Sequence, residues 1–386
     1  MDCALPTLGL YLHVPFCRQK CVYCDFYSLS GAEGSMDAYV TALCAHLQQA
    51  APAAAGRPVD SVYFGGGTPS YLGVRRLSAI LNAVACFYSL TPEAEITLEA
   101  NPDSLGDIAA VSALRRAGIN RISLGMQSGD DNELAAIGRI HTHRQTAQAV
   151  ETARSAGIDN LSLDLIYALP SQTMQRWDAT LSAALALAPD HLSCYGLKVE
   201  PGTPLAASPA RNLIPPEDLQ ADLYLYTAER LRQEGYQQYE ISNFAKPGRE
   251  SRHNLKYWTL GEYLGFGPGA HSDFGGRRFA WARSLPQYLT AAQSGRFTPS
   301  EENTLTKSDR AAEWLMLGLR TSHGLDPLLF RQNFSLDFQP FLPFLTQCRA
   351  AGYAAEKDAR WSLTPTGFLL SNQIIAALLD TLAQQN

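Results

Sequence analysis

Short apolar runs rich in β-branched and aromatic residues alternate with helix-length amphipathic segments over the first half of the chain. Such a run predicts a buried strand, and apolar residues at helical spacing predict a helix. The predicted strands are 8–14, 59–64, 95–99, 121–125, 160–166 and 191–196. The predicted helices are about 36–49, 75–88, 107–117, 142–156 and 174–188, with Gly118 and Gly157 where two of them should stop. This alternation predicts parallel strands joined by right-handed crossovers.

Parallel strands of this kind either close into a barrel or open into a doubly wound sheet. In both arrangements the chemistry sits on loops that leave the C-terminal ends of the strands. We therefore expect the functional residues of this chain to cluster at those ends.

The pattern changes after residue 200. Proline-rich stretches at 201–204 and 209–216 look like a connector, and the segment to about residue 300 is mixed α+β and rich in Gly, Tyr and Trp. Helices are predicted near 309–319, 326–333, 340–351 and 366–382, with a hairpin-like stretch at 359–363. These elements predict a small winged-helix-like domain. We expect three domains: a barrel at 1–200, a mixed α+β extension at 201–300 and the helical domain at 301–386.

Composition narrows the class of protein. Hydrophobic residues make up 46% of the 386 and charged residues 18%, which is typical of a globular chain. The formal charge of −6 argues against nucleic acid as a partner, including DNA at the winged-helix-like domain. No run approaches the ~18 apolar residues of a membrane span, and the N-terminus lacks the features of a secretory signal. We expect a cytoplasmic protein with mostly reduced cysteines.

Three cysteines follow the first predicted strand at once. Cys17, Cys21 and Cys24 have the spacing C-x3-C-x2-C, and Cys3, Cys44, Cys86, Cys194 and Cys348 are scattered singly, as expected of core residues. A 4Fe–4S cluster usually takes four thiolates, so three leave one iron open to a small molecule. The alternative is zinc completed by His13 or a distant residue. Structural zinc normally shows paired C-x-x-C spacings, and only one such pair is present here.

Other chemistry-bearing residues follow the later strands. Gly65, Gly66 and Gly67 follow the second strand, where the backbone can approach a ligand closely, although such a run also suits a plain tight turn. The polar residues at or after the other strand ends are Glu99, Gln127, Arg139 and Asp164, and Gly196 ends the sixth strand. A carboxylate within an apolar strand is costly to bury without a partner. Each position has a structural explanation by itself, but together they lie where functional residues are expected.

The cysteine spacing, with Tyr23 before the third cysteine, resembles the radical S-adenosylmethionine (SAM) superfamily. This resemblance implies a full or partial TIM-like barrel, here a partial (β/α)6 barrel, and a 4Fe–4S cluster whose open iron binds the amino and carboxylate groups of SAM. It also implies SAM contacts, with roles not assigned individually, at Tyr11, Tyr23, Gly66, Gly67, Thr68, Glu99, Gln127, Arg139, Asp164 and Gly196.

Longer motifs resemble one branch of that superfamily. LYLHVPFC at 10–17, FGGGTPS at 64–70 and DLIYALP at 164–170 are similar to the oxygen-independent coproporphyrinogen III dehydrogenases and the related HemW-type heme chaperones. The dehydrogenases carry a fourth cysteine two residues after the third, where this chain has Phe26, and a longer segment before the cluster. Both departures argue against coproporphyrinogen oxidation here.

A second motif favours the chaperones. Residues 253–258 match their His-Asn-x-x-Tyr-Trp pattern, with His253, Asn254, Tyr257 and Trp258. Imidazole is a common axial ligand of heme iron, and the two aromatic rings offer flat faces to a porphyrin. Arg249, Arg252 and Lys256 are candidates to pair with propionates. A hydrogen-bonded structural histidine is the alternative for His253, and His271 is a competing ligand.

The resemblance thus implies a heme chaperone that binds a 4Fe–4S cluster, SAM and heme, and passes heme to respiratory heme proteins. Such acceptors would bring the chain to the membrane surface. A homodimer is compatible with the sequence, which does not determine the oligomeric state. The enzymatic alternative is a SAM-cleaving oxidoreductase that decarboxylates porphyrinogen propionates, with the cofactor supplying the chemistry; no catalytic residue is assigned. A cluster protein that modifies RNA is disfavoured by the acidic balance.

Overall fold

The computed structural model describes residues 6–385, so that Cys3 lies outside the described residues. The chain forms two compact units, one made of the segments up to residue 220 and 262–303, the other of 221–261 and 304 onward. The expected middle domain is thus shared between the two units. The reason is a strand at 263–266 that pairs with the first strand of the chain.

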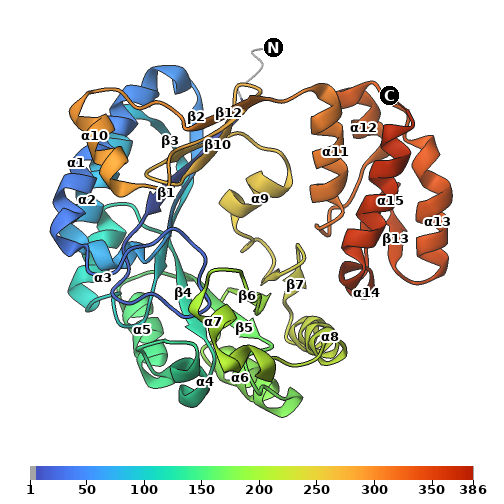
Figure 1. Cartoon of the computed structure of the whole chain (residues 1–386), viewed down its shortest axis with the longest axis horizontal. Helices are drawn as coiled ribbons and strands as arrows, with labels where there is room; N and C mark the ends of the chain where they lie inside the picture. The colour runs from blue at the N-terminus through green and yellow to red at the C-terminus, as the bar shows by residue number, and fades with distance from the viewer. Residues whose placement is uncertain (1–5, 386) are drawn as a thin grey trace. The chain divides into compact units, whose positions relative to one another are not determined.

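The first unit is built on a parallel sheet in which six consecutive strands lie in sequence order (Figure 1). These strands are β1 (Leu8–Val14), β2 (Pro58–Gly66), β3 (Ser89–Ala100), β4 (Arg121–Gln127), β5 (Asn160–Tyr167) and β6 (His191–Gly196). Beyond β1 the sheet continues through β9 (Tyr263–Phe266), β10 (His271–Phe274), β11 (Arg277–Ala280) and β12 (Glu301–Thr304). Because β1 pairs with β9 on one side and β2 on the other, the sheet does not close between β1 and β6. The expected partial α/β barrel is confirmed.

Helices cover the outer face of this sheet (Figure 1). They are α1 (Met36–Ala50), α2 (Val74–Phe87), α3 (Ile108–Arg116), α4 (Asp131–Ala136), α5 (His143–Ser155), α6 (Met174–Ala186) and α10 (Leu285–Gln293). The short helix α7 (Pro204–Ala207) lies beside the cysteine loop instead, where the Leu205 N–H donates to the Val22 carbonyl. Short 3-10 turns lie at Glu33–Ser35, Ala51–Ala54, Pro69–Leu72 and Pro209–Leu213. Local sequence starts these helices where expected: at α5 the Thr142 side chain accepts from the Gln145 N–H, and the Gln145 side chain accepts from Thr142 in return.

The strands explain where the core and the site lie. β1 and β4 are buried along nearly their whole length, as expected for parallel strands covered by helices. The strand residues that are less buried than their neighbours include Tyr11 in β1, Glu99 in β3 and Asp164 in β5. These three positions are polar and line the face of the sheet opposite to the packed apolar side chains.

The second unit contains most of α8 (Glu217–Gln233), the antiparallel pair β7 (Gln237–Gln238) and β8 (Asn243–Ala245), and α9 (Arg252–Trp258). Its C-terminal part comprises α11 (Lys307–Gly318), α12 (Pro327–Phe334), a 3-10 turn (Gln339–Phe341), α13 (Leu342–Ala350), β13 (Ala354–Lys357), β14 (Arg360–Leu363), α14 (Pro365–Leu369) and α15 (Ser371–Ala383). The hairpin β13–β14 and the helices around it form the small C-terminal domain that the sequence predicted.

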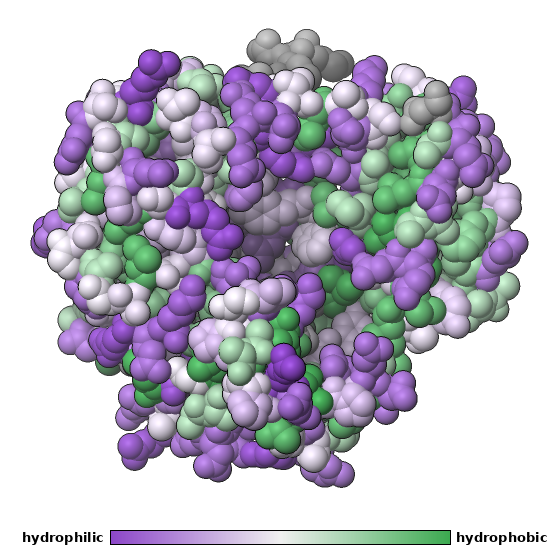
Figure 2. Space-filling model, in the orientation of Figure 1, coloured by the Kyte–Doolittle hydropathy of each residue, from purple (hydrophilic) through white to green (hydrophobic). Residues whose placement is uncertain are grey.

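Aromatic side chains hold this C-terminal part together. The Phe330 ring lies 5.4 Å from Trp314 and 5.6 Å from Phe341, centroid to centroid, and Phe330 is fully buried. The same helix, α12, exposes Leu328 on its other side, at 71%. Figure 2 shows hydrophobic residues on the surface of this unit, whereas much of the first unit's drawn surface is hydrophilic. Between residues 6 and 385, no helix is long and apolar enough to cross a bilayer.

One glycine of the C-terminal part should be hard to replace. Gly324 has φ +63°, and a Cβ there would lie 2.1 Å from the carbonyl oxygen of Trp361, which accepts a hydrogen bond from the Leu325 N–H. We expect Gly324→Ala to destabilise the protein by about 3 kcal/mol, measured by denaturant unfolding, because the strand must shift. Gly235→Ala is the matched control, since its φ is +84° with no atom within 4 Å. It should cost only about 1 kcal/mol, and equal losses would contradict the clash.

Candidate functional site

The cysteine segment is a loop between β1 and α1 that is closed at its base. The Cys17 N–H donates to the Leu29 carbonyl (2.9 Å), and the Leu29 N–H donates to the Pro15 carbonyl (2.7 Å). Further along, the Val22 N–H donates to the Ile137 carbonyl (3.3 Å), and the Val22 carbonyl accepts from Leu205 (2.8 Å). The loop is therefore held against the C-terminal ends of the strands, where the sequence placed it.

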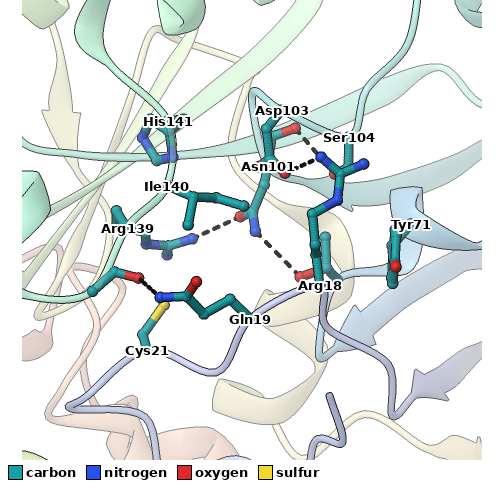
Figure 3. Close-up of a pocket in the computed structure, with 12 residues that line it drawn as sticks. Arg18, Gln19, Cys21, Tyr71, Asn101, Asp103, Ser104, Arg139, Ile140 and His141 are labelled. Atoms are coloured by element: carbon teal, nitrogen blue, oxygen red, sulfur yellow. Dashed lines mark hydrogen bonds and ion pairs between the residues drawn. The ribbon is translucent and has the colours of Figure 1, made fainter. Parts of the chain in front are cut away.

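All three loop thiols are partly buried. Burial raises the pKa of the Cys21 and Cys24 thiols above the ordinary thiol value. Beside Cys21 lies a small polar pocket (Figure 3). It is lined by Arg18, Gln19, Cys21, Thr68, Tyr71, Asn101, Asp103, Ser104, Gly138, Arg139, Ile140 and His141. The pocket thus joins the cysteine loop to the segments after β2, β3 and β4.

A chain of hydrogen bonds crosses this pocket. The Tyr23 hydroxyl accepts from Arg139 (3.0 Å), and the second terminal nitrogen of Arg139 donates to the Asn101 side-chain oxygen (2.8 Å). Asn101 Nδ2 donates to the Thr68 hydroxyl (3.2 Å), which lies 3.5 Å from the Cys17 sulfur. Tyr23, Thr68 and Arg139, three of the SAM contacts that the resemblance implies, are thus linked through one series of hydrogen bonds.

The glycine run after β2 packs against β1 and the cysteine loop. Gly66 has φ +109°, and a Cβ there would lie 2.6 Å from the His13 ring, while a Cβ on Gly67 would lie 2.7 Å from the Phe16 carbonyl oxygen. The Gly67 N–H donates to the Val14 carbonyl (2.8 Å). These close approaches require glycine, so that the run is more than a tight turn.

Two carboxylates lie on the polar face of the sheet. Glu99 accepts from the Tyr63 hydroxyl (2.9 Å) and from the Gly66 N–H (3.2 Å). Asp164 accepts from the Ser123 hydroxyl at 3.0 and 3.1 Å. Desolvation and the charge of Asp164 raise the pKa of Glu99 to about 7, and burial raises the pKa of Asp164. The two acids are therefore placed to accept hydrogen bonds or positive charge from a ligand.

The remaining predicted SAM contacts lie on other strands of the same sheet. Gln127 ends β4 with φ +65°, a strained conformation for a residue with a side chain and one that often marks functional sites. Tyr11 stacks on Tyr63 at 6.3 Å and shares a hydrogen bond with His13 (3.1 Å). Gly196 is the last residue of β6, the strand end that the sequence predicted, and it is exposed.

The acid on β3 should make the stability of the cluster-free protein depend on pH. Glu99 has a pKa of about 7 in the folded protein and 4.5 when it is exposed. Between these two pH values the carboxyl group is therefore protonated mainly in the folded state. Stability is then full below about pH 4.5 and falls as the pH rises to 7 and above, by about 3 kcal/mol in total and by about 2 kcal/mol between pH 5.5 and 8. We expect Glu99→Gln to remove this loss in urea unfolding at pH 5.5 and 8. Glu93→Gln is the control, since Glu93 is exposed on the same strand, and it should keep the wild-type pH dependence. A Glu99→Gln variant whose stability depends on pH as the wild type does would contradict the prediction.

The predicted heme motif forms the short helix α9 in the second unit. The Ser251 side chain accepts from the Asn254 N–H and starts the helix. His253 is fully buried, with Nε2 2.8 Å from the Tyr257 hydroxyl, and burial lowers its pKa to about 3. Trp258 is half-buried at the helix end. The imidazole is therefore neutral at physiological pH, but one ring nitrogen already has a hydrogen-bond partner.

The candidate propionate partners differ in exposure. Arg249 and Arg252 are exposed, whereas Lys256 is 8% exposed beside the backbone of Gly261. The competing ligand His271 is exposed at the start of β10, in the first unit. The structure therefore places the two candidate histidines in different units.

The residues present fit a cluster and a bound ligand. Arg139 Nε and Asp103 Oδ1 are buried in the pocket without a hydrogen-bond partner among residues 6–385, which leaves polar atoms for an absent group. Zinc would need its ligands around one ion, and within the described part of the chain no three His, Cys, Asp or Glu side chains are so arranged. A 4Fe–4S cluster does not need its three cysteine ligands to meet around one ion, because each thiolate binds a different iron.

Sequence reasoning missed some residues of this site. Asn101 directly follows the end of β3, where the expectation about strand ends could have found it. Ser123 lies inside β4 and gave no signal. His13, considered only as a zinc ligand, is buried with Nε2 2.9 Å from the Tyr27 carbonyl oxygen, and burial lowers its pKa to about 4. Its ring thus braces the cysteine loop rather than holding a metal.

The sequence and the fold are similar to those of known proteins. Residues 11–184 match the Radical SAM superfamily and residues 305–370 match the HemN C-terminal domain. "Heme chaperone HemW" of Synechocystis sp. is 36% identical over 98% of this chain and 98% of that protein, and the protein of the same name from Escherichia coli is 36% identical over 97% and 99%. A solved structure described as coproporphyrinogen III oxidase (HemN) from Escherichia coli, a radical SAM enzyme, has a TM-score of 0.84 at 26% identity, covering 97% of this chain and 90% of that one. The chain therefore belongs to the radical SAM superfamily and, within it, to the family of proteins named heme chaperone HemW.

Proposed function

We propose that this chain is a heme chaperone that holds a 4Fe–4S cluster and SAM in its first unit and binds heme through α9 in its second. The observation that carries the proposal is the near full-length similarity, at 33–36% identity, to proteins named heme chaperone HemW. The position of Phe26 supports it. This residue stands where the dehydrogenases have a fourth cysteine, and its side chain is 65% exposed.

The first unit would bind the cluster and SAM with its own groups. Cys17, Cys21 and Cys24 would hold the cluster, which when bound supplies an open iron for the amino and carboxylate groups of SAM and an electron for its cleavage. Glu99 and Asp164 offer carboxylate oxygens to the hydroxyl and ammonium groups of SAM. The SAM set is completed by Tyr11, Tyr23, Gly66, Gly67, Thr68, Gln127, Arg139 and Gly196.

The second unit would bind heme with a neutral imidazole. His253 would ligate the iron through a ring nitrogen, since its lowered pKa leaves it unprotonated at neutral pH. Ligation through Nε2 requires the Tyr257 hydroxyl to move away from it. Tyr257 and Trp258 would pack on the porphyrin, with Asn254 as the remaining motif residue, and Arg249 and Arg252 suit propionates.

The cellular setting belongs to the same proposal. The chain would work in the cytoplasm and pass heme to respiratory heme proteins, which would bring it to the membrane surface. It would need no nucleic acid, and a homodimer would be compatible with the transfer.

Heme transfer and porphyrinogen turnover distinguish the chaperone from the enzyme. We expect the reconstituted protein to give a Soret band with hemin that survives desalting. Loaded protein should pass heme to a heme-free b-type cytochrome faster than it loses heme to apomyoglobin. With SAM, dithionite and coproporphyrinogen III under anaerobic conditions it should form no protoporphyrinogen. Catalytic protoporphyrinogen formation without stable heme binding would replace the proposal by the oxidoreductase alternative, which the similarity to the HemN structure favours.

A further inference from the structure

Asn101 connects the loop after β3 to both ends of the cysteine segment. Its side-chain oxygen accepts from Arg139, which also donates to Tyr23 within the loop. Its side-chain nitrogen donates to Thr68, whose hydroxyl contacts the sulfur of Cys17 at the start of the loop. Figure 3 shows Asn101 at the centre of the pocket, with a dashed line to Arg139.

The donor and acceptor of each hydrogen bond from Arg139 through Asn101 and Thr68 to Cys17 follow from the guanidinium group of Arg139. A guanidinium group only donates, so the atom of Asn101 that faces Arg139 must be the oxygen. The amide nitrogen then faces Thr68 and donates to it. A hydroxyl has a single proton, and because the contact with Asn101 uses an oxygen lone pair, that proton is left for the Cys17 sulfur.

The surroundings leave this arrangement little freedom. Thr68 is 5% exposed, so water does not readily compete for its hydroxyl. The nearby Ser104 hydroxyl donates to the backbone carbonyl of Asn101 (3.2 Å) and pairs with Ser70 (2.6 Å). Ser104 therefore supports the Asn101 backbone without contacting the side-chain amide.

We propose that Asn101 is a positioning residue that orients the Thr68 hydroxyl as a donor to the Cys17 sulfur and thereby raises the reduction potential of the cluster bound there. The inference rests on the proposed cluster at Cys17. Hydrogen bonds to cluster sulfurs stabilise the reduced, more negative state. Without the amide, the hydroxyl rotates, and the sulfur loses part of this stabilisation.

A double-mutant cycle in the reconstituted full chain tests the proposal. The measurement is the potential of the SAM-free cluster, from a redox titration followed by electron paramagnetic resonance. Thr68→Val removes the hydroxyl at nearly constant shape, and Asn101→Leu removes the amide without adding charge. We expect each to move the potential to more negative values, and Asn101→Leu to have no further effect in the Thr68→Val background. Thr68→Ser, which keeps the hydroxyl, and Ser104→Ala, in the same pocket, should stay close to wild type.

Each other outcome counts against the inference. An unchanged potential in Asn101→Leu, or an equal shift with and without the Thr68 hydroxyl, would overturn it and leave the proposed function untouched, because the cluster would still form. A wild-type chain that takes up no cluster would overturn both. Iron content and absorbance, recorded for each variant before titration, separate these cases.

Discussion

Cys21→Ala should leave the anaerobically reconstituted protein almost free of iron–sulfur absorbance. Wild type should carry about four irons per chain, and the variant well under one, because a cluster held by three thiolates has none to spare. Cys21 is the central cysteine of the loop, and its neighbour Val22 is fixed to Ile137 and Leu205 by backbone hydrogen bonds. The remaining thiols therefore cannot easily shift to replace it. SAM binding, measured by equilibrium dialysis, should be lost together with the cluster.

A cysteine outside the loop provides the matched control. Cys86 is exposed near the end of α2, and Cys86→Ala should keep wild-type iron content and absorbance. Circular dichroism should show both variants folded, since the loop is closed by main-chain contacts at Cys17 and Leu29 that need no metal. A full cluster in Cys21→Ala would contradict the assignment of three ligands and, with it, the open iron.

The strands of the first unit could be predicted because burial on both faces leaves a strong signal. The strands at 8–14 and 191–196 have the predicted bounds, since most of their residues are buried and turn residues flank them. β3 begins at Ser89 rather than at 95, and its added residues are mostly not buried. Such an extension pairs through the main chain alone, which the hydrophobic pattern does not record.

The return of the chain to the sheet could not be predicted. β9 is a four-residue strand that lies next to β1 although more than two hundred residues separate them in sequence. Short strands carry little periodicity, and a parallel pairing of this kind is a property of the tertiary fold. The division of the middle segment between two units follows from this pairing.

The site was predictable to the extent that topology brings strand ends together. Thr68 and Arg139 lie in one hydrogen-bonded chain, and Glu99 and Asp164 lie close enough for their charges to interact. Asn101 and Ser123 were missed because neutral polar residues at strand ends or within strands have many ordinary explanations. Their role is visible only as hydrogen-bond partners in three dimensions.

His253→Ala should weaken heme binding by about tenfold or more, a loss of at least ~1.4 kcal/mol, if this imidazole is the axial ligand. The structure adds a second expectation, because His253 Nε2 lies 2.8 Å from the Tyr257 hydroxyl. Tyr257→Phe keeps the ring and removes this competing partner. It should therefore bind heme at least as tightly as wild type, provided that Nε2 is the ligating atom. Hemin titration followed at the Soret band measures both variants.

Two comparisons make the result for His253 specific. His271→Ala removes the competing ligand in the first unit, where the side chain is exposed, and should leave the Soret band unchanged. Because His253 is fully buried, its loss also leaves a cavity; His253→Gln retains more volume and should still bind heme poorly. The cluster absorbance of each variant reports whether the first unit has folded. If His253→Ala keeps the wild-type Soret band and His271→Ala loses it, His271 in the first unit is the heme ligand and α9 does not bind heme iron.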